Sequence, residues 1–440
     1  MPAWLIGLIV FGIMMVMVFA GIPIFVSMLT CAFFGFVALY GGDMKMALNI
    51  FTTYPFDLGA NYNYAVLPMF MLVGALAGET GIAEGAFKSV HAFLGRVKGG
   101  LLFTVVGANA LFGACSGSSV AGNIVFGRLA MPELEKAGYN RKYSLGCVAA
   151  SGALSTLIPP SMGIIMFCLV APVTMSVGTA LMGGIIPGII TAVALCVTVR
   201  IIGLVKPGSI PPGGGPKIPV SEKLKSLRLL IPILCLFGLI IGGTFAGWFT
   251  ATVGGAVGAV AVCIYALCKK MPLKQLGACM VDAAVMEAGI FPIIVGGQIF
   301  SKFISDTGLA DYLSAAIASV HAPRFIIFLL VILLYVFCGC VMDIMSIIII
   351  TVPVVFPILT GMGYSPYALV IALCFVAEIA GLTPPIGMNV FATANALRIN
   401  PSEIFKGVVP YFICEIALVL LIGLFPQIVT FLPTLMGVGG

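Results

Sequence analysis

Long apolar runs that carry almost no charge dominate this sequence and leave few folds open to it. Only 8% of the 440 residues are charged, whereas soluble domains average about 25%. A helix needs about 20 apolar residues to cross a bilayer, and the apolar length here suffices for roughly a dozen crossings and hairpins. The runs are continuous and do not alternate with polar residues, which excludes a membrane β-barrel. The sequence therefore predicts an all-α polytopic membrane protein embedded in a lipid bilayer.

The charged residues gather in loops between the apolar runs. The formal net charge is +6, and basic residues cluster at 88–98 and again at 206–228. Because Lys and Arg accumulate in cytoplasmic loops, both clusters predict the cytoplasmic side, and three spans before the first cluster place the N-terminus outside. This distribution suits an anionic membrane leaflet and does not indicate nucleic-acid binding. The thirteen cysteines lack CxxC or Cys/His spacing, which predicts buried free thiols.

The segment 206–228 is the only linker-like stretch, and it lies near the midpoint of the chain. It begins with a run rich in proline and glycine and continues with charged residues. We therefore expect a first repeat half over 1–205, a basic cytoplasmic linker over 206–228, and a second repeat half over 229–440.

The two halves share a pattern of turns and prolines. Gly138-Tyr139 precedes Pro159-Pro160 by the same distance as Gly363-Tyr364 precedes Pro384-Pro385, and the two sets lie 225 residues apart. Paired interrupted segments in two halves are typical of repeat-built secondary transporters, which bind ions and solutes at their broken helices. The pattern predicts two structural repeats, each with a helix broken at Pro-Pro.

A break made of small residues precedes each Pro-Pro pair. Gly113-Ala-Cys-Ser-Gly-Ser-Ser-Val-Ala-Gly122 interrupts one apolar run, and the 225-residue offset places Cys338-Gly-Cys-Val-Met-Asp343 opposite it. Glycine weakens a helix and serine competes for its backbone hydrogen bonds. In lipid such breaks are tolerated only where they are buried in protein or line a cavity. We expect re-entrant helical hairpins near 104–130 and 325–357; small residues at a tight helix–helix contact are the alternative.

Broken helices in these positions provide ligands for ions. Unwound turns and half-helix C-termini present carbonyls to a cation, and half-helix N-termini present N–H groups to an anion. Sodium is a hard ion that favours oxygen, as calcium and magnesium do. We predict two cation sites, one in each half. The candidate lining residues are Ser116, Ser118, Ser119, Ser155, Thr156 and Pro159 in the first half and Gly339, Asp343, Thr383 and Asn389 in the second.

Four charged residues lie within or next to apolar sequence, where ionised groups are costly. Asp343 sits in a break and is the best functional candidate among the acids. Glu378 and Glu415 fit a functional role and a protonated or paired structural role equally well. Arg128 either meets a substrate carboxylate or extends toward the membrane interface. No phosphate-binding Gly-x-x-x-x-Gly-Lys loop occurs, and Ser118 has no histidine near it, so the sequence does not predict an enzyme.

Three motifs in combination resemble the large membrane subunit of tripartite ATP-independent periplasmic (TRAP) transporters. They are Gly113-Ala-Cys-Ser-Gly-Ser-Ser119, Ala149-Ala-Ser-Gly-Ala-Leu-Ser-Thr-Leu-Ile-Pro-Pro-Ser161 and Gly381-Leu-Thr-Pro-Pro-Ile-Gly-Met-Asn389. The resemblance covers essentially the whole chain. It implies an elevator-type, ion-transporter-like importer of organic acids in the bacterial inner membrane, driven by sodium. It also implies two partners, a small membrane subunit and a periplasmic substrate-binding protein.

The resemblance further implies where sodium ions bind, at the two hairpin tips and the broken helices that face them. Most ligands would be backbone oxygens. The implied positions are Gly117, Ser118 and Val120 for the first hairpin and Gly339, Ala380, Thr383 and Ile386 for the second. Ala380 departs from the family pattern, which often reads Gly-Leu-x-Thr-Pro-Pro.

Two other functions stay open on the sequence alone. One is a stand-alone, ion-coupled carboxylate carrier of the related ion-transporter type, with the same hairpins and no further subunit. The other is a channel-like or structural membrane protein, in which Ser118→Ala and Thr383→Ala would leave ion-coupled transport intact. The sequence does not identify the organic acid.

Overall fold

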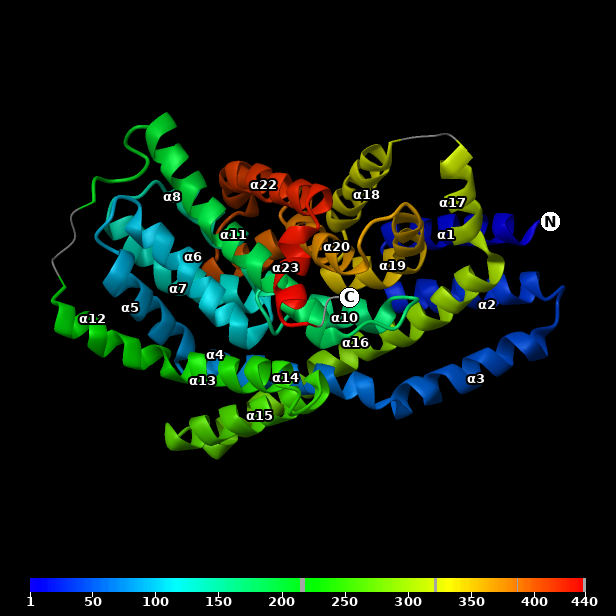
Figure 1. Ribbon diagram of the computed structural model, residues 1–440, viewed down its shortest axis with the longest axis horizontal. Helices are drawn as coiled ribbons and strands as arrows, with labels where there is room; N and C mark the ends of the chain where they lie inside the picture. Colours follow the sequence, from blue (N-terminus) through cyan, green and yellow to red (C-terminus); the bar gives the residue numbers. More distant parts are fainter. Residues whose placement is uncertain (214–217, 320–322, 386, 438–440) are drawn as a thin grey trace.

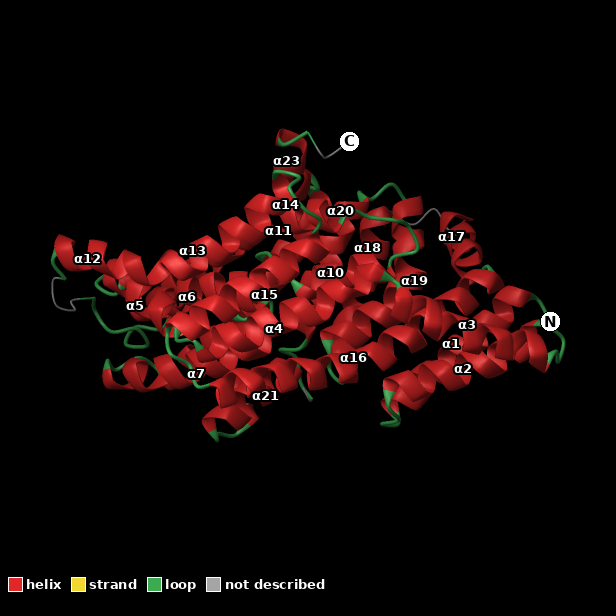
Figure 2. Ribbon diagram, turned by 90° about the horizontal axis from the view of Figure 1, so that it is seen from below, coloured by secondary structure: helices red, strands yellow, loops and turns green. Residues whose placement is uncertain are grey.

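The computed structural model describes residues 1–213, 218–319, 323–385 and 387–437. Within these ranges the regular elements are all helices, and no strand occurs in them. The helices form one elongated body, with α12 at one end and the N-terminus at the other (Figure 1). Short loops join most consecutive helices, as the view from below shows (Figure 2). The expected all-helical fold is confirmed.

Five helices precede the first break, and local signals explain where they begin. Gly21 has a φ of +87° and separates the first two helices. The Asp43 carboxylate accepts a hydrogen bond from the Lys45 N–H at 2.9 Å and caps the third. A short 3-10 turn, Tyr62–Ala65, bends the chain by 54° before the fourth. The helices are α1 (Ala3–Phe19), α2 (Ile24–Leu39), α3 (Met44–Ala60), α4 (Val66–Glu79) and α5 (Ile82–Leu94).

The next part of the chain forms a helix pair and then a broken helical run. The broken run bends by 48° at its Pro-Pro pair. A single long helix follows and leads to the middle of the chain. The elements are α6 (Gly100–Ser116), α7 (Ser119–Lys136), α8 (Arg141–Ser151), α9 (Leu154–Leu157), α10 (Met162–Val170) and α11 (Val177–Val205).

The middle of the chain contains the longest helix, of 35 residues. The segment expected as a linker is partly helical, because α12 begins within it. A π-helical stretch, Gly238–Gly242, continues the helical run into α14. The elements are α12 (Val220–Leu227), α13 (Ile231–Phe237), α14 (Gly243–Phe245), α15 (Ala251–Cys268), α16 (Leu273–Thr307) and α17 (Leu309–Ser319).

The last part of the chain again contains a helix pair and a broken run. The two pairs, α6–α7 and α18–α19, lie over the two segments expected as hairpins. The elements are α18 (Arg324–Gly339), α19 (Ile344–Gly361), α20 (Pro366–Ala380), α21 (Met388–Leu397), α22 (Pro401–Leu424) and α23 (Gln427–Leu435).

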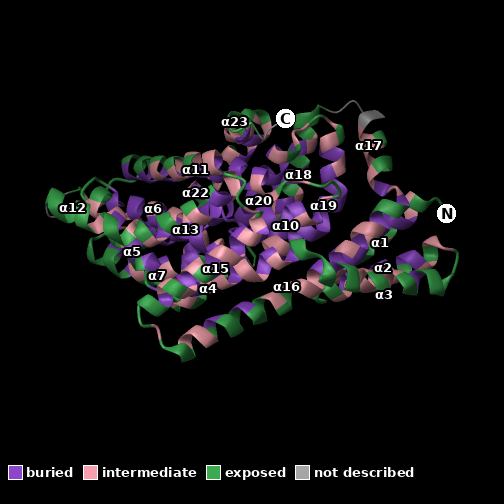
Figure 3. Ribbon diagram, turned by 60° about the horizontal axis from the view of Figure 1, so that its bottom comes forward, coloured by how far each residue is buried: buried purple, intermediate pink, exposed green. Residues whose placement is uncertain are grey.

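The protein interior is built around α10, α19 and α20 (Figure 3). Every residue from Ala368 to Ala380 in α20 is buried. Peripheral helices expose large apolar side chains instead, for example Leu234 of α13 and Val281 of α16. An apolar exterior around a buried interior is what lipid contact allows.

Six described helical segments are long and apolar enough to cross a membrane, or eight if each of the two bent pairs is one span. The arms α6 and α18 have 17 and 16 residues, fewer than the roughly 20 that a crossing needs. Some apolar runs of the sequence therefore form helices too short to cross a bilayer. For this reason the described part of the chain has fewer candidate crossings than apolar runs.

Two hydroxyl groups join the arms of the pair α18–α19. The Tyr335 hydroxyl and Thr351 Oγ1 lie 2.6 Å apart, and both side chains are buried. A buried hydrogen bond contributes about 1 kcal/mol, so Tyr335→Phe should lower the thermal midpoint by about 1–2 °C. A thermal-shift assay of the purified protein measures this. Tyr367→Phe is the control, because no hydrogen bond of the Tyr367 hydroxyl occurs in the described part of the chain. Equal shifts for both variants would contradict the prediction.

Candidate functional site

The first hairpin tip is the reversal between α6 and α7. Gly117 ends α6 with a φ of +59°, a left-handed conformation that glycine adopts without steric cost. Ser118 is the N-cap residue of α7, and its Oγ accepts a hydrogen bond from the Ala121 N–H at 3.3 Å. The arms touch near the tip, since a methyl group on Gly122 would lie 2.3 Å from Asn109 Oδ1. The glycine and serine residues thus form a tight turn between two packed helices.

This first tip contacts the first Pro-Pro break. A methyl group on Gly117 would lie 2.7 Å from the Pro160 carbonyl oxygen, and one on Gly113 would lie 2.7 Å from Ser155 Cα. Ser155, Thr156 and Pro159 are buried. Ser155 Oγ has no hydrogen-bond partner among the described residues. The backbones of the tip and the break therefore meet with no space for an added side chain, and the predicted first-half residues come together here.

The second hairpin tip is shaped by Asp343. Its carboxylate accepts hydrogen bonds from the Met345 N–H at 3.0 Å and the Ser346 N–H at 3.3 Å, and also from the Ser346 hydroxyl. These bonds cap the start of α19 and satisfy N–H groups that the helix cannot. The Asp343 carboxylate oxygens are therefore hydrogen-bonded to the first turn of α19.

The second tip contacts the end of α20. A methyl group on Gly339 would lie 2.1 Å from Ala380 Cβ. Cys340 Sγ and Thr383 Oγ1 lie 3.5 Å apart, and the Thr383 hydroxyl donates a hydrogen bond to the Ala380 carbonyl at 2.6 Å. The predicted residues Gly339, Ala380 and Thr383 are thus neighbours. Ile386 lies outside the described residues.

Glu378 joins the two halves. The Thr156 hydroxyl donates a hydrogen bond to Glu378 Oε2 at 2.7 Å, and the Asn389 side-chain amide donates to Glu378 Oε1. Ser119 Oγ lies 3.5 Å from Asn389 Oδ1. All four side chains are buried, with exposed fractions of 3–8%. One carboxylate therefore links the break of the first half to α21 of the second, and Asn389 extends the link to the first tip.

The chemistry of this region is that of neutral oxygens around two acids, Asp343 at the second tip and Glu378 between the halves. Hydroxyl and carbonyl oxygens predominate, and no group of three or more His, Cys, Asp or Glu side chains that could hold a metal occurs in the described ranges. Such a donor set fits a hard monovalent cation such as sodium and does not fit a soft or transition metal. That these residues bind sodium remains a prediction.

Three candidates take positions outside this cluster or at its margin. The Arg128 Nε donates to the Ala396 carbonyl at 3.4 Å, so this exposed side chain ties α7 to α21. It is ten residues along α7 from Ser118, or about 15 Å. Glu415 is fully buried, and neither carboxylate oxygen has a hydrogen-bond partner among the described residues. Val120 is half-buried beside the first tip.

Two asparagines behind the first tip were not predicted. The Asn109 amide donates to Ser151 Oγ at 2.9 Å, and the Asn123 amide donates to the Ala149 carbonyl at 3.1 Å. Both asparagines are fully buried. They link α6 and α7 to α8. An asparagine within an apolar helical run is unusual, and this feature of the sequence could have marked both residues as candidates.

The fold and these contacts define a multi-pass helical membrane protein whose two hairpin tips meet two broken helices, an arrangement typical of secondary transporters. The family model described as the tripartite ATP-independent periplasmic transporter, DctM component, matches residues 11–428. The chain belongs to this family and is the large permease subunit of a TRAP transporter. Its function is therefore that of a transporter subunit and not of an enzyme.

Curated relatives match over most of their length. The C4-dicarboxylate TRAP transporter large permease protein of Pseudomonas aeruginosa is 28% identical, over 87% of this chain and 88% of the relative. The ectoine large permease protein of Halomonas elongata is 27% identical, over 94% and 95%. The sialic acid large permease protein of Vibrio cholerae is 27% identical, over 95% and 96%.

Two solved transporters have a similar fold. The YdaH transporter of Alcanivorax borkumensis matches with a TM-score of 0.64 at 15% identity, over 88% of this chain and 89% of that one. MtrF of Neisseria gonorrhoeae matches with a TM-score of 0.59 at 13% identity, over 88% and 85%. At these identities the likeness concerns the fold alone.

Proposed function

We propose that this permease subunit imports an organic acid across the bacterial inner membrane, driven by the sodium gradient. Substrate reaches it from a periplasmic binding protein, and a small membrane subunit completes the complex. The tripartite family description supports both partners. The relatives are named for C4-dicarboxylates, ectoine and sialic acid, and these solutes all carry a carboxyl group, which supports a carboxylate as substrate.

The pair of tip-to-break contacts carries this proposal. Gly117 lies against Pro160, and Gly339 lies against Ala380. Each contact brings the ends of interrupted helices together, where carbonyl oxygens without an intrahelical partner are concentrated. Serine hydroxyls at the first tip and Thr383 at the second add further oxygens. Each contact therefore holds one sodium ion, and the two repeats hold a pair.

The way in which these elements are tied together supports elevator-type alternating access. The Thr156–Glu378 and Asn389–Glu378 hydrogen bonds join the broken helices of both halves. The Ser119–Asn389 contact adds the first hairpin. Elements linked in this way move as one body against the peripheral helices, and they carry the ions and the substrate with them.

Uptake into proteoliposomes tests the proposal. The large subunit, the small subunit and the loaded binding protein together should accumulate a radiolabelled carboxylate only under an inward sodium gradient. Uptake by the large subunit alone would instead identify the stand-alone carrier. Uptake without sodium would overturn the coupling.

Ser118→Ala and Thr383→Ala should each raise the sodium concentration for half-maximal uptake about tenfold, since a hydrogen-bonding or ligating oxygen contributes about 1–2 kcal/mol. Ser365→Ala is the matched control, because Ser365 is an N-cap residue whose side chain makes no capping hydrogen bond. A measurement of initial rate against sodium concentration gives the result. If both site variants keep the wild-type sodium dependence, the result would favour a channel-like or structural membrane protein over a sodium-coupled transporter.

A further inference from the structure

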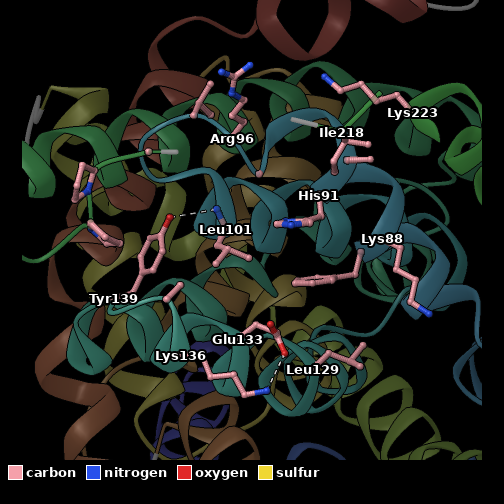
Figure 4. Close-up of a pocket in the computed structure, with 18 of the residues that line it drawn as sticks. Lys88, His91, Arg96, Leu101, Leu129, Glu133, Lys136, Tyr139, Ile218 and Lys223 are labelled. Carbon is pink, nitrogen blue, oxygen red and sulfur yellow. Dashed lines mark hydrogen bonds and ion pairs between the residues drawn. The ribbon is translucent and has the colours of Figure 1, made fainter. Parts of the chain in front are cut away.

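A large cavity lies between α5 and its following turn, the start of α6, the end of α7, residues 211–213, and residues 218–223 at the start of α12. Its volume is about 1130 Å³. Arg96 and Lys223 lie on one side of it, Glu133 and Lys136 lie on the other, and His91 lies between them (Figure 4). None of the residues predicted for ion or substrate binding lines this cavity.

The charge around the cavity is strongly positive. Four basic side chains line it, namely Lys88, Arg96, Lys136 and Lys223, with Glu133 as the acid. Glu133 is already paired with Lys136, at 3.3 Å. No ion pair of the other three cations occurs within the described parts of the chain. The cavity therefore offers an excess of positive charge to an anion.

Two polar side chains of the lining have unused hydrogen-bonding capacity. His91 Nδ1 is buried and has no hydrogen-bond partner among the described residues. Burial lowers the pKa of His91, and Glu133 partly opposes this effect. The Tyr139 hydroxyl accepts a hydrogen bond from the Leu101 N–H at 3.4 Å, which leaves its proton for another acceptor.

Much of the remaining lining is apolar, which suits an amphiphilic ligand. The apolar side chains come from the same parts of the chain as the basic ones and from the start of α6. They include Phe87, Leu101, Leu129, Ile218 and Val220. A small inorganic anion would leave this surface in contact with water, whereas the glycerol and upper acyl carbons of a lipid would cover it.

We infer that this cavity binds the phosphate group of an anionic phospholipid from the cytoplasmic leaflet. Basic pockets on the cytoplasmic side of membrane proteins attract such head groups, and the positive loops that border this one are predicted to be cytoplasmic. The phosphate lies between Arg96 and Lys223, and the apolar part of the lipid covers Phe87 and Leu129. The bound lipid joins α5 to α7 and α12, and so it holds the base of the first hairpin.

Thermal stability in detergent tests this inference without any transport measurement. Phosphatidylglycerol should raise the midpoint of the purified full-length protein, and phosphatidylcholine should not. The double variant Arg96→Gln/Lys223→Gln should weaken the apparent phosphatidylglycerol affinity about tenfold or more, since each basic group near an anionic lipid contributes appreciably to binding.

Lys269→Gln/Lys274→Gln is the matched control, with the same change in charge at another basic turn. Lys269 lies over the Tyr265 ring at 5.6 Å, much as Lys223 lies over the Phe93 ring at 5.8 Å. The control should keep the wild-type response. If both double variants lose phosphatidylglycerol affinity equally, the lipid effect depends only on the overall charge of the protein, and the inference is overturned. A full response to inorganic phosphate alone would assign the site to a soluble anion and overturn the lipid as its ligand.

Discussion

Replacing Gly339 with alanine is expected to reduce sodium-driven uptake by about five- to a hundredfold. The added methyl group would lie 2.1 Å from Ala380 Cβ, a distance that forces the second tip away from α20. Overpacking of this kind costs about 1–3 kcal/mol, and every 1.4 kcal/mol is about tenfold in an equilibrium. Because the proposed second ion site is formed by this contact, the loss should appear as a raised sodium requirement as well as a lower rate.

Two further variants make the Gly339 prediction specific. Gly361→Ala, at the far end of α19, adds a methyl group with nothing within 4 Å and should leave uptake at the wild-type level. Gly339→Ala combined with Ala380→Gly removes one of the clashing carbons and should recover part of the activity. Undiminished uptake by Gly339→Ala, with unchanged sodium dependence, would show that the tip-to-break contact does not form the site.

Replacing Glu378 with glutamine is the second change with a large expected effect. The carboxylate accepts hydrogen bonds from Thr156 and Asn389, and a glutamine side chain can accept from only one of them through its oxygen. The new amide N–H then lies either against the Asn389 amide or against the Thr156 hydroxyl, which must turn to accept it, and the loss of a hydrogen bond to the carboxylate costs about 1–3 kcal/mol. We expect the sodium affinity to fall about tenfold and the Hill coefficient for sodium to fall toward one, because the link between the halves is weakened.

A surface acid provides the control for Glu378. Glu403 pairs with Arg141 at 3.1 Å, and both side chains are nearly half exposed. Exposed ion pairs contribute about 0–1 kcal/mol, so Glu403→Gln should leave the sodium dependence unchanged. Loss of folded protein in Glu378→Gln together with normal sodium cooperativity in the surviving fraction would assign Glu378 a structural role only.

Some features of the site follow from local chemistry and could be predicted residue by residue. Gly117 permits the left-handed turn that ends α6, and Ser118 caps α7 through its own Oγ. Asp343 caps α19 in the same way. These effects involve neighbours along the chain, so residue type and spacing are enough to predict them. The breaks and the all-helical class were predicted for this reason.

Contacts between distant parts of the chain could not be predicted in this way. Thr156 and Glu378 are 222 residues apart, and Ser119 and Asn389 are 270 apart. The sequence left the role of Glu378 open because one of its partners, Thr156, lies in the other half. Arg128 likewise finds its acceptor, the Ala396 carbonyl, 268 residues away. Nothing near these residues in sequence specifies such partners.

The sequence by itself determined that this chain is a helical membrane protein with paired breaks, because hydrophobic length and helix-breaking residues act locally. Only the tertiary structure decided that Glu378 joins the two halves and that Asn389 extends this link to the first tip. These contacts depend on how whole helices pack around a buried interior, and packing is set by the shapes of surfaces that are distant in sequence. The same packing separates the basic cavity of α5, α7 and α12 from the proposed ion sites.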